Sequence, residues 1–274
     1  MFVLDSVPQI KLNNGAKIPQ LGFGTWKLRE GSEAENAVKW AIEAGYRLID
    51  TAAIYGNEES VGKAIAESGV PRKELFVTTK LWNNSHERVE QAFDESLEKL
   101  GLDYVNLYLI HWPVEKRIET WRKLEKILES GRARGIGVSN FTVYHLEDLL
   151  DDGVSVVPAA NQVEFSPFLY QKGLLEYCQK KGIALEAYSP LARTHKFDNP
   201  LLKEIASAHS KSPAQVMIRW ALQRGLIVIP KSSHKERIKE NFEVFDFSLS
   251  QQEMSKLDAL NENYRTCWDP SGMP

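Results

Sequence analysis

Short apolar runs recur along the chain, and longer amphipathic stretches separate each run from the next. Short runs that are apolar throughout are typical of strands buried on both faces of a sheet. The predicted strands are residues 20–24, 47–50, 76–80, 105–111, 135–139, 159–163, 184–188 and 226–230. Because these strands alternate with helical patterns, their order predicts a parallel sheet with crossover helices.

The stretches between the strands carry helix start and stop signals. Ser32 followed by Glu35 predicts a capping box on the first helix, and Gly45 predicts the end of that helix. Ser85 predicts the start of a later helix that ends at Gly101. Further predicted helix ends and caps are Gly131, Gly182, Gly225 and the pair Ser250 and Glu253.

Two architectures fit this alternation, an open doubly wound sheet and a closed barrel. The open sheet would normally carry a GxGxxG fingerprint after an early strand, but the nearest match, which begins at Gly22, has Lys27 in place of the third glycine. A closed barrel of this kind takes about 250 residues, close to the 274 of this chain. We therefore predict a (β/α)8 TIM barrel that forms a single domain over residues 1–274.

The two ends of the chain frame this predicted barrel. Residues 10–18 alternate apolar and polar positions around Asn14-Gly15, which is a strong signal for a β-hairpin. Since the hairpin precedes the first barrel strand, we expect it to plug the lower mouth of the barrel. Residues 261–274 are predicted to form a short C-terminal tail.

The composition is that of an ordinary globular protein, with 43% apolar and 26% charged residues. Lys and Arg total 34 against 37 for Asp and Glu, so the formal net charge is −3. This balance gives no general attraction for nucleic acid or an anionic membrane. Residues 1–5 carry no basic segment, and no apolar run approaches the roughly 18 residues of a membrane span. We therefore expect a cytoplasmic protein without a membrane or nucleic-acid partner.

The chain has two cysteines, Cys178 and Cys267, with no CxxC pattern and no histidine at metal-ligand spacing. A disulfide framework and a structural metal site are therefore not expected. Cys178 falls on the apolar face of a predicted helix, which indicates a core residue, and both thiols are expected to lie outside the mouth of the barrel.

Polar residues gather at the predicted carboxyl ends of the strands, where barrel enzymes place their chemistry. These residues are Asp50, Lys80, His111, Ser139, Asn140, Gln162, Tyr188 and Lys231. Each alone has an ordinary structural explanation, such as a helix cap or a packed imidazole. Three successive strands that end in Asp, Lys and His face one mouth, however, which favours a catalytic set.

Tyr55, in the loop that follows Asp50, completes this set. A cation beside the phenol would lower its pKa and make it a suitable general acid for a developing oxyanion. His111 can hydrogen-bond the same oxygen. No GxSxG nucleophile elbow is present, and no side chain supplies a hydride. Proton donation to a carbonyl therefore implies a nicotinamide cofactor.

The sequence resembles the aldo-keto reductase family over essentially its whole length. The segments that carry the resemblance are Gly22-Phe-Gly-Thr-Trp26, Asp50-Thr-Ala-Ala-Ile-Tyr55-Gly56-Asn57-Glu58, Thr79-Lys80-Leu-Trp82, Leu109-Ile-His111-Trp112-Pro113, Gly135-Ile-Gly-Val-Ser139-Asn140-Phe141, Asn161-Gln162, Tyr188-Ser189-Pro190-Leu191 and Ile229-Pro230-Lys231-Ser232. They occur in the family's order and at its strand positions. The short loop after Trp112 and the short tail are similar to those of small microbial members, which resemble 2,5-diketo-gluconate reductases and prostaglandin F synthases.

The resemblance implies a catalytic tetrad of Asp50, Tyr55, Lys80 and His111, the set reached from the strand ends. It implies NADPH as the cofactor and a cofactor site made of Thr25, Trp26, Asp50, Ser139, Asn140, Gln162, Tyr188, Ser189, Leu191, Lys231, Ser232, Arg237, Glu240 and Asn241. It implies a substrate pocket made of Trp26, Tyr55, Trp82, His111 and Trp112. Of the adenosine-end residues, Lys231 and Arg237 are cations that can face a 2′-phosphate, although a solvated charged turn would look the same.

The resemblance therefore implies an NADPH-dependent reductase that converts small aldehydes and ketones into alcohols. A non-catalytic cofactor-binding protein on the same fold is the alternative, and the complete tetrad argues against it. The sequence leaves open which carbonyl compound is reduced, with methylglyoxal, sugar-derived carbonyls and toxic aldehydes as candidates. It also leaves open whether Trp268 in the tail reaches the pocket, while a closed domain of low net charge is compatible with a monomer.

Overall fold

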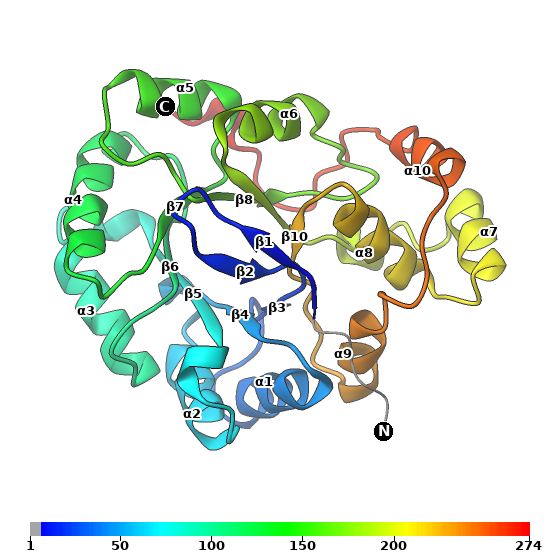
Figure 1. Cartoon of the computed structure of the whole chain (residues 1–274), viewed down its shortest axis with the longest axis horizontal. Coiled ribbons are helices and arrows are strands. Elements are labelled where there is room, and N and C mark those ends of the chain that lie inside the picture. The colour runs from blue at the N-terminus through cyan, green and yellow to red at the C-terminus, as the bar shows by residue number, and fades with distance from the viewer. Residues whose placement is uncertain (1–6) are drawn as a thin grey trace.

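A computed structural model describes residues 7–274 of the chain, so the predicted absence of a leader at residues 1–5 lies outside the described residues. Eight parallel strands form the centre of the molecule, in the order in which they occur along the chain (Figure 1). They are β3 Phe23–Gly24, β4 Leu48–Asp50, β5 Phe76–Leu81, β6 Leu107–Ile110, β7 Ile136–Ser139, β8 Ala160–Glu164, β9 Ala184–Tyr188 and β10 Ile227–Val228.

Backbone hydrogen bonds between the first and last strand regions close this sheet. The Gly22 N–H donates to the Val228 carbonyl at 2.9 Å, and the Gly24 N–H donates to the Pro230 carbonyl at 3.1 Å. The Val228 N–H returns a bond to the Gln20 carbonyl at 2.8 Å. The predicted (β/α)8 barrel is therefore confirmed. Residues 20–24 and 226–230 were predicted as longer strands than β3 and β10, and residues of these two segments outside β3 and β10 take part in the bonds at this seam.

Helices surround the barrel (Figure 1). They are α1 Ser32–Ala44, α2 Glu58–Glu67, α3 Val89–Leu100, α4 Arg117–Glu129, α5 Val143–Asp151, α6 Lys172–Lys181, α7 Pro200–Ala208, α8 Pro213–Gln223, α9 Lys235–Phe242 and α10 Gln251–Asp258. Helices α1 to α8 lie between successive strands, and α9 and α10 follow the last strand. Gly45, Gly101 and Gly182 end α1, α3 and α6 in the left-handed conformation, as predicted. Within residues 7–274, none of these helices has both the length and the apolar character that crossing a membrane requires.

The predicted capping box of Ser32 and Glu35 and the predicted helix start at Ser85 are wrong, whereas the capping box of Ser250 and Glu253 on α10 is confirmed. Gly31 precedes the first turn of α1, and Ser32 makes no capping hydrogen bond. The Glu35 N–H instead donates to the Gly31 carbonyl at 3.0 Å, and the Glu35 carboxylate accepts a hydrogen bond from Lys63 of α2 at 3.0 Å, so neither half of the box forms. Ser85 ends the short 3-10 turn Asn83–Ser85 rather than starting α3.

The predicted N-terminal hairpin is confirmed and lies across one end of the barrel (Figure 1). It consists of the antiparallel strands β1 Gln9–Lys11 and β2 Lys17–Pro19. Leu12 and Ile18 are buried against apolar side chains of the barrel interior. The side chains of Asn13 and Asn14 donate to the carbonyls of Pro158 (2.9 Å) and Arg134 (3.1 Å). Since these carbonyls precede β8 and β7, the hairpin plugs the amino-terminal mouth.

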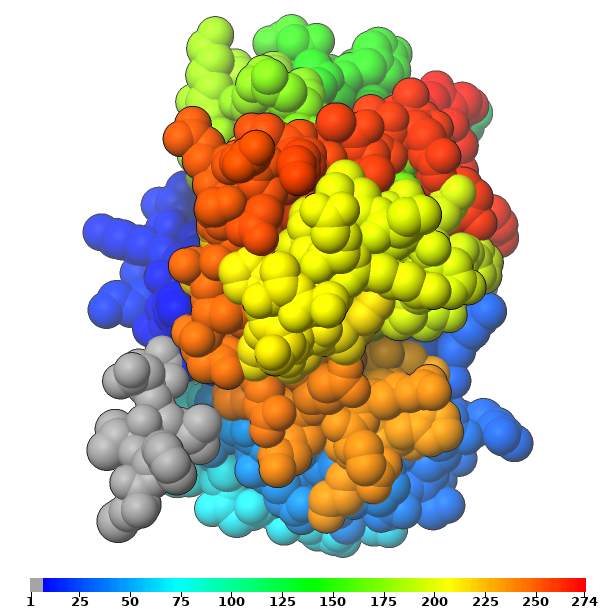
Figure 2. All heavy atoms as spheres, turned by 90° about the vertical axis from the view of Figure 1, so that its right-hand side faces the viewer, coloured from blue at the N-terminus to red at the C-terminus, as the bar shows by residue number. Residues whose placement is uncertain are grey.

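The C-terminal tail lies at the opposite end of the barrel. Figure 2 shows the hairpin in blue on the left and the last residues of the chain in red on the right. Glu164, the last residue of β8, accepts hydrogen bonds from the backbone N–H groups of Thr266 (2.7 Å) and Cys267 (3.1 Å). Arg117 donates to the Pro274 carbonyl at 2.6 Å. These contacts hold the tail over the carboxyl ends of the strands.

Gly62 allows α2 and α3 to approach closely, because a Cβ atom there would lie 2.1 Å from the carbonyl oxygen of Leu100. We expect Gly62→Ala to lower the free energy of unfolding by about 2–3 kcal/mol through overpacking, measured by chemical denaturation. Gly173→Ala in α6 is the matched control, because its Cβ would meet no atom within 4 Å. Equal unfolding curves for the two variants would contradict the close approach.

Candidate active site

The predicted catalytic residues meet at the carboxyl-terminal mouth of the barrel. Asp50 ends β4, Lys80 lies near the end of β5, and His111 follows β6. Tyr55 ends the short 3-10 turn Ala53–Tyr55 above β4. Four neighbouring segments therefore bring one carboxyl, one amine, one imidazole and one phenol to a single place.

Lys80 is the centre of this cluster. Its Nζ donates to Asp50 Oδ1 at 2.6 Å, to the Thr51 carbonyl at 2.8 Å and to Tyr55 Oη at 3.4 Å. The ion pair of Lys80 and Asp50 is buried. A buried ammonium is tolerated only when its protons are satisfied in this way. The three bonds therefore fix Lys80 between the carboxylate and the phenol.

Burial raises the pKa of Tyr55 well above its ordinary value, and the negative charge of Asp50 raises it further. The predicted lowering of this pKa is wrong, because withdrawal of the phenol from water is the largest effect and the charge of Asp50 acts in the same direction. The phenol therefore keeps its proton. A protonated phenol beside an ammonium group is a hydrogen-bond donor that can give its proton to a neighbouring oxygen.

The His111 ring lies between two aromatic rings. Its centroid is 5.7 Å from that of Tyr55 and 5.2 Å from that of Trp82, both edge to face. Burial, together with the charge of Lys80, lowers the pKa of His111 well below its ordinary value. The imidazole is therefore neutral, and it can orient an oxygen atom without adding charge.

Gln162 connects Asp50 to the far side of the barrel. Gln162 lies on β8, and its Nε2 donates to Asp50 Oδ2 at a distance of 2.7 Å. Burial raises the pKa of Asp50, whereas the contacts with Lys80 and Gln162 pull it down. Both oxygens of the Asp50 carboxyl therefore accept hydrogen bonds, which fixes its orientation.

The remaining polar residues at this mouth form one hydrogen-bonded wall. Ser139 Oγ donates to the Gln162 carbonyl at 2.8 Å, and Asn140 Nδ2 donates to the His111 carbonyl at 3.0 Å. The Tyr188 hydroxyl donates to Asn140 Oδ1 at 2.8 Å. Asn140 has a positive φ of 64°, which turns its side chain back toward this wall. The predicted residues on β7, β8 and β9 are thus brought together.

The segment that follows β9 crosses the mouth in an unusual backbone conformation. Ser189, Ala192, Arg193 and Thr194 all have positive φ, between 44° and 68°. Left-handed backbone in non-glycine residues is strained and is found mainly at functional sites. The predicted cofactor residues Ser189 and Leu191 lie at the start of this segment.

Thr25, another predicted cofactor residue, follows β3 and donates its hydroxyl to the Asp50 carbonyl at 2.9 Å.

Arg193 contacts two parts of the mouth. Its guanidinium lies 4.7 Å from the centroid of the Trp26 ring, and its Nη2 donates to the Cys267 sulfur at 3.1 Å. Cys267 therefore lies in the mouth, which corrects the prediction that both thiols lie outside it. The tail carries Cys267 there, and no local pattern in the sequence predicts this path. Cys178, by contrast, is buried in the core as predicted, and burial raises its thiol pKa to about 12.

The predicted adenosine-end residues lie between β10 and α9. Ser232 and Asn241 are buried, Lys231 and Glu240 are half-buried, and Arg237 is exposed. Burial lowers the pKa of Lys231, and Glu33 from α1 partly offsets this effect. Within residues 7–274, neither Lys231 nor Arg237 forms an ion pair. Two cations in this region are therefore available for an anionic ligand.

The tryptophans predicted to line the substrate pocket are only partly brought together. Trp82 packs against His111, and Trp112 packs against Trp268 with ring centroids 5.5 Å apart. Trp268 therefore reaches the aromatic side of the mouth at Trp112, although 63% of its surface stays exposed. Trp26 contacts Lys27 and Arg193 instead. Aromatic rings therefore border the mouth.

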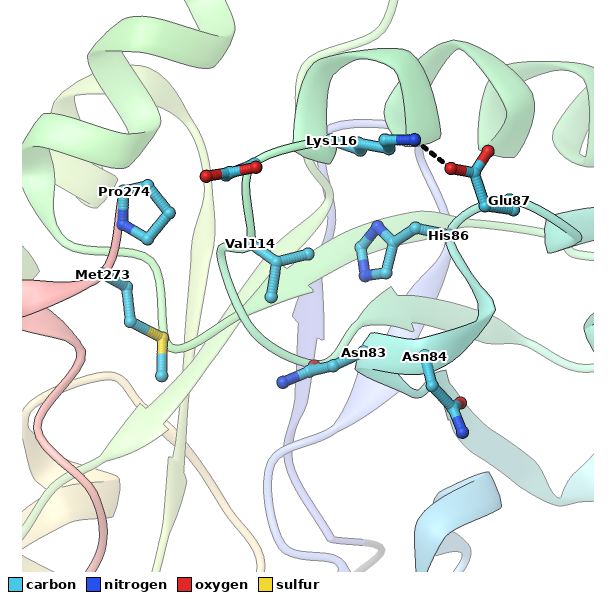
Figure 3. A pocket seen from close by; sticks show the side chains of 9 residues that line it. Asn83, Asn84, His86, Glu87, Val114, Lys116, Met273 and Pro274 are labelled. Atoms are coloured by element: carbon cyan, nitrogen blue, oxygen red, sulfur yellow. Dashed lines mark hydrogen bonds and ion pairs between the residues drawn. The ribbon is translucent and has the colours of Figure 1, made fainter.

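A cavity of about 450 Å³ lies between the loops that follow β5 and β6 and the end of the tail (Figure 3). Its lining includes Asn83 and Val114, which are close in sequence to Trp82 and Trp112, and an ion pair of Lys116 and Glu87 lies along one side. The cavity contains none of the four residues of the predicted tetrad.

Three polar residues of the mouth were missed from the sequence. Glu164 anchors the tail, Arg193 contacts Trp26, and Glu186 lies inside the barrel. Glu186 alone had a usable signal, because it is a charged residue in an otherwise apolar strand, two positions before Tyr188. Arg193 and Glu164 act through contacts with segments far away in the sequence.

Comparison with known proteins identifies related chains. The sequence model of the Aldo/keto reductase family matches residues 20–262. The glyoxal reductase of Bacillus subtilis is 53% identical over 264 residues, which cover 95% of both chains. The 9,11-endoperoxide prostaglandin H2 reductase of Trypanosoma cruzi is 50% identical over 267 residues, covering 95% of this chain and 94% of the other. The crystal structure of a Bombyx mori aldo-keto reductase in complex with NADP superposes with a TM-score of 0.92 at 41% identity and covers 98% of both chains.

Proposed function

The chain belongs to the aldo/keto reductase family of oxidoreductases, and from this premise we propose that it reduces small aldehydes and ketones to alcohols with NADPH. The observation that carries the proposal is the buried Lys80, which touches Asp50 and Tyr55 at once. The names of two relatives, a glyoxal reductase and a methylglyoxal reductase, support small carbonyl compounds as the substrate class.

The residues of the mouth fit a phosphorylated dinucleotide. Aromatic and amide groups suited to a nicotinamide surround the tetrad, and cations without ion-pair partners within residues 7–274 lie near α9. When bound, NADPH supplies the hydride that reduces the carbonyl carbon. The residues proposed to hold it are Thr25, Trp26, Asp50, Ser139, Asn140, Gln162, Tyr188, Ser189, Leu191, Lys231, Ser232, Arg237, Glu240 and Asn241.

The tetrad explains how the carbonyl oxygen gains its proton. Tyr55 Oη gives the proton, and the Lys80 ammonium at 3.4 Å stabilises the phenolate that remains. Asp50 holds Lys80 in place, and the neutral His111 orients the carbonyl oxygen. A protein that only bound the cofactor would not need this proton donor, so the geometry favours an enzyme.

The aromatic border formed by Trp82, Trp112 and Trp268 suits small carbonyl compounds. A screen of NADPH oxidation with aldehydes, dicarbonyls and keto-sugars tests this proposal. We expect loss of absorbance with several of these compounds and the fastest loss with a small dicarbonyl. The absence of NADPH oxidation with every class would contradict the proposed activity.

Arg237 is proposed to meet the 2′-phosphate that distinguishes NADPH from NADH. A charge-assisted hydrogen bond contributes about 1.5–3 kcal/mol, so Arg237→Ala is expected to raise the Kd of NADPH about ten- to a hundredfold. The Kd of NADH should change little. Titration of both cofactors by quenching of tryptophan fluorescence measures the two effects.

Lys239→Ala is the matched control, because Lys239 is an exposed cation of the same helix that pairs with Glu243 at 3.8 Å. It should leave the Kd of NADPH unchanged. If Arg237→Ala raised the Kd of NADPH and the Kd of NADH by the same factor, Arg237 would not be the residue that meets the 2′-phosphate.

A further inference from the structure

Glu186 is a carboxyl group inside the barrel that the proposed mechanism does not use. Ala184 and Tyr188 on the same strand pack toward the interior, and side chains alternate along a strand. Glu186 therefore faces inward as well. It has no exposed surface, and within residues 7–274 neither of its carboxyl oxygens has a hydrogen-bond partner. An unpartnered carboxylate at such a place would be very costly.

The neighbours of Glu186 belong to the catalytic cluster. Gln162 lies beside it on β8, in register, and the amide of Gln162 donates to Asp50 Oδ2 at 2.7 Å. The charged groups that act on Glu186 are Asp50 from β4 and Lys80 from β5. On the other neighbouring strand, β10, the residue in register with Glu186 is the apolar Ile227. This interior therefore holds two carboxyl groups and one cation, and the cation is bonded to Asp50 at 2.6 Å.

Burial, followed by the charge of Asp50, raises the pKa of Glu186 to about 8, although the charge of Lys80 lowers it in part. Glu186 is then protonated at neutral pH. With Glu186 neutral, Asp50 and Lys80 balance each other. If Glu186 ionised, its charge would raise the pKa of Tyr55, and the phenol would become a weaker acid.

We propose that Glu186 is a positioning residue, a neutral carboxylic acid whose proton keeps Lys80 available to Asp50 and Tyr55 alone. The proposal rests on the proposed reductase function. It predicts that activity falls as Glu186 ionises, although Glu186 does not touch the substrate.

The pH profile of kcat tests this role. The wild type is expected to lose activity as the pH rises through about 8. Glu186→Gln has the same shape and no proton to lose, so it should keep its rate across that range. Glu186→Ala removes the side chain and is expected to lower kcat about ten- to a hundredfold at every pH, through misplacement of its neighbours. We therefore expect Glu186→Gln to retain the kcat that Glu186→Ala loses.

Glu58→Gln is the matched control. Glu58 is a second buried glutamate with a raised pKa, and its Oε1 accepts a hydrogen bond from Thr79 at 2.6 Å. The Glu58→Gln variant should leave unchanged the pH at which kcat falls on the alkaline side. An unchanged alkaline limb in Glu186→Gln, or loss of its activity at every pH, would overturn the proposal.

Two readouts do not depend on activity. Infrared difference spectra of the wild type and Glu186→Gln at pH 7 should show the carbonyl band of a protonated carboxylic acid in the wild type. Because the folded wild type holds this proton from the unfolded pKa of about 4.3 up to about 8, Glu186→Gln should gain thermal stability over the wild type across that range. Above about pH 8 the gap should stay constant.

A missing acid band, or a stability gap that does not change with pH, would overturn the role of Glu186 even in an active reductase. A wild type that reduces no carbonyl compound would instead overturn the proposed function and leave the two physical measurements unaffected.

Discussion

Replacement of Tyr55 by Phe is expected to lower kcat for carbonyl reduction by about 10²–10⁴-fold, the usual contribution of a positioned general acid. Tyr55 combines a proton held by its raised pKa with an ammonium group at 3.4 Å. Phe keeps the ring that packs edge to face on His111 and removes only the hydroxyl. Steady-state kinetics with a small dicarbonyl substrate measures the loss.

The same variant should bind NADPH with a Kd close to that of the wild type, because the hydroxyl is proposed to act on the carbonyl oxygen. Tyr144→Phe is the matched control, since 63% of Tyr144 is exposed. It should keep the wild-type rate. A Tyr55→Phe enzyme that retained most of its kcat would remove Tyr55 from the mechanism.

Replacement of Lys80 by Met is expected to have the second largest effect. It leaves Asp50 buried without its cation, and breaking a buried ion pair typically costs about 3–5 kcal/mol of stability. It also removes the ammonium that stabilises the Tyr55 phenolate, so kcat should fall by about 10²-fold or more. Asp50→Asn should lower kcat less, because Asp50 reaches Tyr55 through Lys80.

The double variant Asp50→Asn with Lys80→Met separates stability from catalysis. It leaves no unpaired charge, so its free energy of unfolding should recover toward that of the wild type, as measured by denaturation. Its kcat should remain as low as that of Lys80→Met. Recovery of activity in the double variant, or a larger loss from Asp50→Asn than from Lys80→Met, would contradict these roles.

The barrel was predictable because its signals are local. Apolar strands recur with helices between them, and the polar residues Asp50, Lys80 and His111 stand at successive strand ends. Parallel strands place their carboxyl ends on one side, so the site follows from the order of the elements. The failure of the capping box at Ser32 shows the limit of local signals, because Lys63 of another helix binds the Glu35 carboxylate that the box would use.

The electrostatics of the site could not be predicted in this way. The pKa of Tyr55 depends on how completely all neighbouring segments remove it from water, and a sequence motif records only that Lys80 is near. Glu186 and Cys267 show the same difficulty. The position of Glu186 beside Gln162, which bonds Asp50, depends on strand register across the barrel, and the position of Cys267 depends on the path of the tail.

The most direct test of the account is to follow deuterium from NADPH labelled at the nicotinamide C4 into the product of a small dicarbonyl, by mass spectrometry. The wild type should yield an alcohol with deuterium on the former carbonyl carbon, and Tyr55→Phe should yield it about 10²–10⁴ times more slowly. An unlabelled product from the wild type, or equal rates of labelling by the two proteins, would contradict reduction by hydride transfer with Tyr55 as the acid.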